Sequence, residues 1–303
     1  MADHSGNIRV QDRRGLILSL ILVFSYFLVE LLGGIWTNSL ALISDAGHMF
    51  SDVGALGFSL IALSWASKLP TPEKTYGYHR LEILAALING LILWGITIFI
   101  FLEAYHRLQE PPVVKSSAML IVAVVGLAVN IFSAWLLYPS QDRSINLRSA
   151  FLHVLADGLG SLAAIGASLA MLWKGWYWFD PLVSFFIGLL IIGASWQLIQ
   201  EATAILMEST PRHLDTKKVS QSLQQVPGVI NIHDLHIWTI TSGLYTLSVH
   251  AVVNGRRDRE TLRCEMMTLL KDKFGLEHTT IQLEEESNAC PNFCSLRQLS
   301  SEI

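Results

Sequence analysis

The chain has 303 residues, of which 51% are apolar and only 15% are charged, and its mean hydropathy is +0.44. Soluble globular proteins carry about 25% charged residues, so this composition excludes an ordinary soluble protein, and equally a disordered or fibrous one. The formal net charge of −4 argues against nucleic acid as a partner. The apolar residues are concentrated in residues 15–207, whereas the chain from about residue 212 onward has the composition of a water-facing domain.

Six apolar segments are each long enough to cross the hydrocarbon core of a membrane, which takes about 20 residues. They cover residues 16–36, 40–65, 83–102, 119–138, 150–172 and 177–199. Lys and Arg are more frequent in the N-terminal segment and in the second and fourth loops than in the other loops. Because basic residues favour the cytoplasmic side, we expect the N-terminus and, after six crossings, the C-terminus in the cytoplasm.

The chain after Pro211 predicts a small α+β domain. Its pattern favours helices at 215–225 and 258–274 and strands at 229–240, 244–253 and 279–284, with a hairpin turn at Ser242 and Gly243. We expect one sheet with the helices on one face. The predicted fold is therefore an α-helical membrane bundle of six transmembrane helices at 1–210, followed by a small cytoplasmic α+β domain with a C-terminal tail at 211–303.

Two of the predicted spans contain ionisable residues, which are costly inside a membrane and are commonly functional there. The second span holds His48 and Asp52, and the fifth holds His153 and Asp157. The His-x-x-x-Asp spacing places both side chains of a pair on one helix face, about 6 Å apart along the axis. Two such faces turned toward each other offer two imidazole nitrogens and two carboxylates, a tetrahedral ligand set suited to zinc.

A purely structural interpretation would make each His–Asp pair a hydrogen bond that holds helices together. Two pairs with the same spacing favour a metal site, because burying four unpaired ionisable groups is too expensive for packing alone. Asp45 lies one turn before His48, so we expect it beside the site rather than among the ligands. Asn130 is expected to make a polar contact between helices, and the pattern gives Glu30 no role.

Four segments, spread over nearly the whole chain, carry a recognisable series of motifs. They run from Ser44 to Asp52, Tyr76 to Leu84, His153 to Asp157 and His233 to Trp238. In this order they resemble the cation diffusion facilitator family of divalent-metal transporters, and the paired His-x-x-x-Asp spacing is similar to its zinc-transporting branch. The resemblance implies six spans, a cytoplasmic metallochaperone-like domain, a homodimer and exchange of metal for protons. It also puts both His–Asp pairs at the family's transport-site positions.

The C-terminal domain holds a second set of candidate ligands. His233 lies in its first predicted strand, His250 in the second, and Glu284 at the end of the third. The hairpin turn could bring the two histidines together, although they could equally be strand-surface histidines that share no ligand. The family resemblance favours a zinc site, since these three residues match positions where relatives bind zinc. It adds Cys290 and Cys294, because relatives of the zinc branch use tail cysteines.

The leading functional hypothesis is a zinc/proton antiporter that exports zinc from the cytoplasm by alternating access. Zinc binds deprotonated ligands and so expels protons, and the ordinary imidazole pKa of about 6.5 puts this exchange near physiological pH. Zinc is then the transported substrate and a regulatory ligand, and no catalytic cofactor is expected. The alternatives are efflux of mainly cobalt, cadmium or iron(II), and an intramembrane zinc enzyme, which would need an open coordination position and a general base.

The expected partners are zinc ions, protons, membrane lipid and a second copy of the chain, in a bacterial inner (plasma) membrane. The family resemblance also implies one ion pair. In the family, a basic residue at the start of the third span pairs with an acidic residue after the sixth, and Arg80 and Glu208 occupy these positions.

Overall fold

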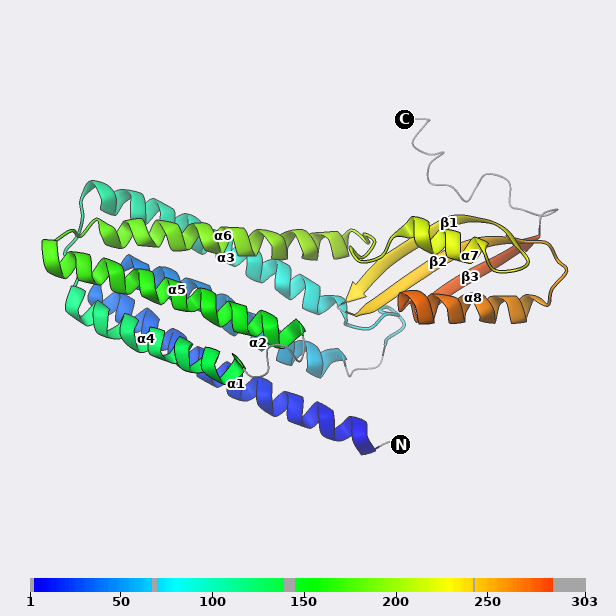
Figure 1. Ribbon diagram of the computed structural model, residues 1–303, viewed down its shortest axis with the longest axis horizontal. Coiled ribbons are helices and arrows are strands. Elements are labelled where there is room, and N and C mark those ends of the chain that lie inside the picture. The colour runs from blue at the N-terminus through cyan, green and yellow to red at the C-terminus, as the bar shows by residue number, and fades with distance from the viewer. Residues whose placement is uncertain (1–2, 67–69, 139–144, 242, 286–303) are drawn as a thin grey trace. The chain divides into compact units, whose positions relative to one another are not determined.

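The computed structural model describes residues 3–66, 70–138, 145–241 and 243–285 (Figure 1). The chain divides into two compact units. The first consists of Met1–Ser67 and Leu84–Gln200, and the second of Lys68–Ile83 and Glu201–Ile303.

The first unit is a bundle of long helices (Figure 1). The helices are α1 (Asp3–Thr37), α2 (Leu40–Ala66), α3 (Arg80–Gln109), α4 (Ser116–Leu137), α5 (Ile145–Lys174) and α6 (Phe179–Leu206), of which α3 begins and α6 ends in the second unit. The helices lie where the six apolar segments predicted them.

Among the described residues, four helices are long and apolar enough to cross a membrane. They are Arg80–Gln109, Ser116–Trp135, Val154–Lys174 and Phe179–Leu206, and Val23–Thr37 of α1 is a shorter apolar stretch. Large apolar side chains such as Leu102, Ile121 and Phe186 are about two-thirds exposed, as lipid-facing side chains would be. The unit is a helical transmembrane domain, and crossing by α1 and α2 stays a prediction.

The helices of the first unit pack in two groups. Helix α1 packs on α2 and α4, α4 packs on α5, and α2 also contacts α5, so both His-x-x-x-Asp segments belong to this group of four. Helices α3 and α6 pack on each other, with the rings of Trp94 and Trp196 stacked 5.5 Å apart. Gly90 and Gly188 permit this close approach, because a Cβ at either position would collide with Ile199 or Phe101.

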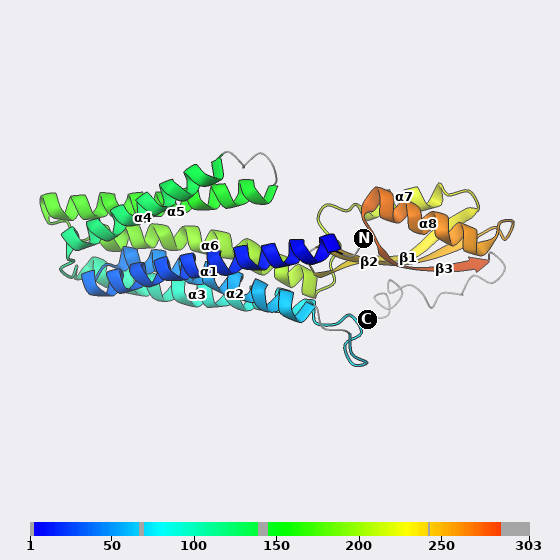
Figure 2. The same ribbon diagram turned by 90° about the horizontal axis from the view of Figure 1, so that it is seen from below.

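The second unit contains α7 (Thr216–Gln224), β1 (Val229–Thr241), β2 (Leu244–Val253), α8 (Arg259–Phe274) and β3 (His278–Glu285). The strand order is β1-β2-β3, with β1 antiparallel and β3 parallel to β2. Both helices cover the same face of the sheet (Figure 2). The predicted three-stranded α+β domain is confirmed, whereas the parallel direction of β3 was not predicted.

Local sequence signals and a shared core explain these elements. Asp215 and Asp258 accept hydrogen bonds from backbone N–H groups at the starts of α7 and α8, and Gly275 ends α8 with φ +68°. The core lies between the sheet and the helices; its fully buried members are Val219, Leu223, Leu247, Val249, Ala251, Leu262, Met266, Leu270 and Leu276. All of them come from the segment that follows α6, so this domain has a hydrophobic core of its own.

Two candidate metal centres

The His–Asp pairs of the membrane domain lie on two helices that contact each other, α2 and α5. Nε2 of His48 is 3.5 Å from Oδ1 of Asp157, and both side chains are half-buried. Two ligand atoms bound to one tetrahedral zinc at about 2.0 Å lie about 3.3 Å apart, so this spacing suits a shared metal ion. Asp52 follows on α2, one helical turn after His48.

The remaining predicted ligand is His153. Its backbone belongs to α5, four residues before Asp157, but its side chain lies outside what the structure describes. The structure therefore shows a histidine and a carboxylate brought together across α2 and α5. The four-ligand assignment of the transport site stays a prediction.

Two buried carboxyl groups lie next to this pair. Asp45 is 7% exposed and faces α5, because a Cβ added to Gly160 would lie 3.2 Å from its Oδ1 atom. Glu30 of α1 is 1% exposed, accepts a 2.5 Å hydrogen bond from the hydroxyl of Tyr26, and lies within electrostatic reach of Asp45. The sequence analysis assigned no role to Glu30. An acidic residue inside an apolar segment could nevertheless have indicated a functional one.

Two asparagines tie neighbouring helices to the segments that carry the His–Asp pairs. Nδ2 of Asn130 in α4 donates to Ser161 Oγ in α5 at 3.4 Å, so the predicted polar contact between helices is confirmed. Nδ2 of Asn89 in α3 donates to Ser51 Oγ at 2.8 Å, and the residue Asn89 is only 3% exposed. Asn89 was missed, because a single amide in an apolar span does not indicate its partner.

The second centre is in the C-terminal domain. It consists of His233, His250 and Glu284, whose ligand atoms all lie within 4.8 Å of one another. In the described part of the chain, this is the one group of three or more His, Cys, Asp or Glu side chains with such a spacing. The β1–β2 register pairs His233 directly with His250. Oε1 of Glu284 is 2.9 Å from His250 Nδ1, and Oε2 is 3.4 Å from His233 Nε2. The three strands thus bring together three residues that the sequence singled out.

The donor atoms of this cluster fit a zinc ion. Two imidazoles and one carboxylate are a common zinc ligand set, which leaves a fourth tetrahedral position open. Oε2 of Glu284 is buried and lies 3.4 Å from His233 Nε2, but it accepts no hydrogen bond from any residue that the structure describes. A buried carboxylate oxygen normally has a partner, and a metal ion would provide one. The predicted tail ligands, Cys290 and Cys294, lie outside the described residues.

A bulge in β1 places two further polar side chains beside the cluster. The strand pairing shifts between His233 and His236, where Asp234 has φ +49°. Oδ1 of Asp234 is 3.0 Å from His236 Nε2, and Oδ2 is 3.8 Å from His250 Nε2. Bulges often redirect side chains next to functional sites, but period-2 patterning cannot reveal one, so Asp234 was missed.

The predicted ion pair at the start of α3 is confirmed. Nη2 of Arg80 donates to Oε1 of Glu208 at 2.8 Å, and the two side chains are 38% and 60% exposed. Two residues further along α3, Glu82 accepts a 2.7 Å hydrogen bond from Thr241 Oγ1 at the end of β1. The start of α3 is thereby attached to the segment after α6 and to the sheet of the same unit.

If the protein transports metal ions as its motifs predict, we expect the single variants Arg80→Glu and Glu208→Arg to lower the transport rate severalfold, and the charge-swapped double variant to recover most of it. The effect should be modest, because an exposed pair contributes at most about 1 kcal/mol. Initial rates in liposomes, compared at equal amounts of folded protein, measure it. Lys271 and Glu277 form a similarly exposed pair, 3.3 Å apart, and swapping their charges is the control. If the losses of transport rate in the two single variants add up in the double variant, Arg80 and Glu208 do not act as a pair.

A helical membrane domain followed by a small domain with a His–His–Glu cluster is an architecture expected of a protein that handles metal cations. The sequence comparisons agree. Residues 16–207 match the family described as "Cation efflux transmembrane domain", and residues 211–286 match "Cation efflux protein, cytoplasmic domain". The chain belongs to this cation efflux family, which is the cation diffusion facilitator family that the motifs predicted.

Several relatives are similar over nearly their whole length. The "Cadmium, cobalt and zinc/H(+)-K(+) antiporter" of Bacillus velezensis is 41% identical, with 93% of this chain and 90% of the relative covered. The "Zinc transporter ZitB" of Escherichia coli is 37% identical, with coverages of 95% and 92%. The solved structure of the metal-bound C-terminal domain of the CzcD transporter from Cuprividus metallidurans is 40% identical over 23% of this chain and 99% of that chain, with a TM-score of 0.23.

Proposed function

We propose that this protein is a zinc/proton antiporter that exports zinc from the cytoplasm by alternating access. The observation that carries the proposal is the approach of His48 and Asp157 across α2 and α5, inside a helical membrane domain of the cation efflux family. Two relatives named as a zinc transporter and as a zinc/H(+)-K(+) antiporter support the choice of cargo and counter-ion. The protein acts as a transporter and not as an enzyme, and it uses no catalytic cofactor.

The transport site consists of His48, Asp52, His153 and Asp157. Zinc enters as the substrate and displaces protons from the imidazole and carboxylate groups that hold it. After the bundle has opened to the other side, protons reload the same groups and the metal leaves. All six helices cross a bacterial inner membrane, both termini lie in the cytoplasm, and two copies form a homodimer. Residues 1–210 form the membrane domain and 211–303 the cytoplasmic domain.

The cytoplasmic centre has a different role. His233, His250 and Glu284 bind a regulatory zinc ion, with Cys290 and Cys294 as additional ligands from the tail. The three central residues lie on three different strands, so a bound ion would stabilise the whole sheet. Such a site reports the cytoplasmic zinc level without carrying ions across the membrane.

Reconstitution into liposomes tests the proposal. One set of vesicles contains a zinc-sensitive dye and another contains a pH-sensitive dye, and protein-free vesicles are the control. We expect added zinc to enter while protons leave, and an opposing pH gradient to accelerate zinc entry. Zinc entry without proton movement would exclude antiport, and the absence of metal movement in protein that is folded would exclude transport.

A broader metal range is the second candidate function. A mixed imidazole–carboxylate site binds several divalent metals, and the Bacillus velezensis relative is named for cadmium and cobalt as well as zinc. Adding cobalt, cadmium or iron(II) as competitors in the same zinc assay ranks these metals. A competitor that is preferred over zinc would make this second candidate the main function.

The change His48→Asp is expected to shift this ranking. It replaces a nitrogen ligand by an oxygen ligand, which makes the site harder and should raise acceptance of hard cations such as manganese(II) relative to zinc severalfold. The readout is the ratio of initial rates for the two metals in vesicles. His278→Asp, at an exposed histidine of β3, is a matched control that should leave the ratio unchanged. An unchanged ranking in His48→Asp would remove His48 from the ligand set.

A further inference from the structure

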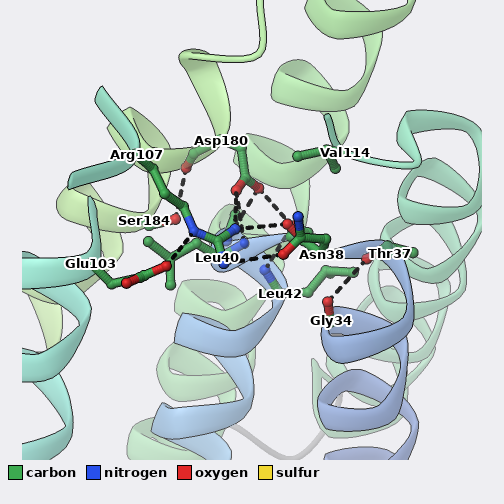
Figure 3. A network of polar contacts seen from close by, with 12 residues as sticks. Gly34, Thr37, Asn38, Leu40, Leu42, Glu103, Arg107, Val114, Asp180 and Ser184 are labelled. Atoms are coloured by element: carbon green, nitrogen blue, oxygen red, sulfur yellow. Dashed lines mark hydrogen bonds and ion pairs between the residues drawn. The ribbon is translucent and has the colours of Figure 1, made fainter. Parts of the chain in front are cut away.

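A buried carboxylate of α6 holds the beginning of α2 (Figure 3). Asp180 is 0% exposed. Its Oδ1 atom accepts hydrogen bonds from Ser39 Oγ at 2.6 Å and from the backbone N–H of Ala41 at 3.2 Å. Its Oδ2 atom accepts the backbone N–H of Leu40 at 2.7 Å. No local sequence pattern predicts this contact, which joins residues about 140 positions apart.

These bonds satisfy groups that a helix cannot satisfy by itself. The first backbone N–H groups of any helix lack partners inside that helix, and a local side chain or a ligand normally accepts them. Helix α2 follows a tight turn in which Asn38 has φ +58°, and its own cap is the hydroxyl of Ser39, which accepts from Leu42 N at 3.3 Å. Asp180 accepts two further N–H groups from another helix, and its negative charge suits the positive end of the α2 dipole.

A half-buried arginine holds this carboxylate and the turn together. Arg107 of α3 donates to the backbone oxygen of Asn38 at 2.8 Å and to Asn38 Oδ1 at 3.2 Å. It also donates to Glu103 at 2.8 Å, and its Nη1 lies 4.0 Å from Asp180 Oδ2 (Figure 3). A buried carboxylate without a cation nearby would be strongly destabilising. The start of α2 is therefore attached to both members of the α3–α6 pair.

The anchored end of α2 is rigidly connected to the proposed ligands. His48 lies eight residues after Leu40, which is about 12 Å of helix. Leu40, Leu42 and Ala46 are at most 1% exposed, and a Cβ at Gly34 of α1 would collide with Ile43, so this stretch fits closely against its neighbours. A slip of one residue would move α2 by about 1.5 Å and turn it by about 100°, which would carry both ligands off the face that meets α5.

We infer that Asp180, held by Arg107, is a positioning residue for transport: by capping α2 from α6, it fixes the depth and rotation at which α2 presents His48 and Asp52 to α5. This inference rests on the proposed transport site. It assigns to α3 and α6 a part in metal binding, although neither helix supplies a ligand.

The test is a zinc concentration series in liposomes, which separates KM from kcat. We expect Asp180→Ala to raise the KM for zinc about tenfold, the lower end of what changes around a metal site produce, and to affect kcat less. Asp180→Asn keeps the size and one acceptor oxygen and should raise KM by less. Ser184→Ala is the matched control, because Ser184 is equally buried but donates only to the backbone oxygen of Asp180. Its KM should stay within about twofold of wild type.

The outcomes separate three explanations. A lower yield of folded protein with unchanged KM would mean a purely structural role and overturn the inference, as would a fall in kcat alone. If Asp180→Ala does not fold, an unchanged KM in Asp180→Asn also overturns it. Asp157→Ala, measured in parallel, reports on the transport site itself. Wild-type transport by that variant would remove the proposed transport site, whereas a normal KM in the Asp180 variants would remove only the positioning role.

Discussion

Replacing Asp157 with alanine is expected to abolish zinc transport while the protein stays folded and dimeric. Asp157 supplies the carboxylate that lies 3.5 Å from His48 Nε2 across α2 and α5. A closed four-ligand site that loses one carboxylate should bind zinc more weakly by orders of magnitude. The readout is zinc uptake into liposomes, with gel filtration to verify the dimer.

The control for this variant is Leu159→Ala, two residues further along α5. Leu159 is 64% exposed, so its truncation removes only a surface-facing apolar side chain and should leave transport close to wild type. Asp157→Asn adds a second test, because it keeps the shape of the side chain and removes its negative charge. Wild-type transport by well-expressed Asp157→Ala would exclude Asp157 as a ligand and would disprove the proposed transport site.

Zinc is expected to stabilise the isolated C-terminal domain, from about residue 210 onward, against thermal unfolding. The fragment contains its own hydrophobic core, from Val219 to Leu276. A ligand that binds only the folded state raises the free energy of unfolding by about 2.7 kcal/mol at a hundredfold excess over Kd. His250→Ala should remove most of this gain, because His250 contacts Glu284 at the centre of the cluster. Melting curves with and without zinc measure both effects.

Two comparisons make this experiment specific. His278→Ala removes a histidine that is exposed on the same sheet, and it should keep the full zinc response. The response should also fade in acid, since protons compete with zinc for the imidazole nitrogens. If zinc does not shift the melting temperature of the wild-type fragment at neutral pH, the regulatory site does not exist and the transport site is unaffected.

The sequence predicted those features that depend on local patterns. Apolar runs located the six long helices, and alternating residues with turn signals located the three strands. The ends were less accurate: the third apolar segment was predicted at 83–102, but α3 extends from Arg80 to Gln109. Glu103 and Arg107 ended the apolar run, yet they continue the helix, because they bond to each other at i and i+4.

Contacts between distant segments were not predictable in the same way. The predicted hairpin turn made a pairing of His233 with His250 possible, but the position of Glu284 depends on a strand that pairs in parallel after a helix. Asn89, Asp180 and Asp234 were missed because their partners lie on another helix or depend on a bulge. A pattern of period 3.6 or 2 specifies a face of an element, and only the folded structure specifies what that face meets.

The parallel pairing of β2 with β3 has a consequence for the order in which the strands of the C-terminal domain pair during folding. The hairpin of β1 and β2 closes locally, whereas β3 can pair with β2 only after α8 has crossed over the sheet. We therefore expect the two imidazoles to come together early in folding and the carboxylate of Glu284 to join them with the last strand. A metal ion bound at this cluster would stabilise the pairing of β3 with β2, which is the last and slowest step of sheet formation. Amide exchange in β3 should then slow far more on zinc addition than exchange in the β1–β2 turn.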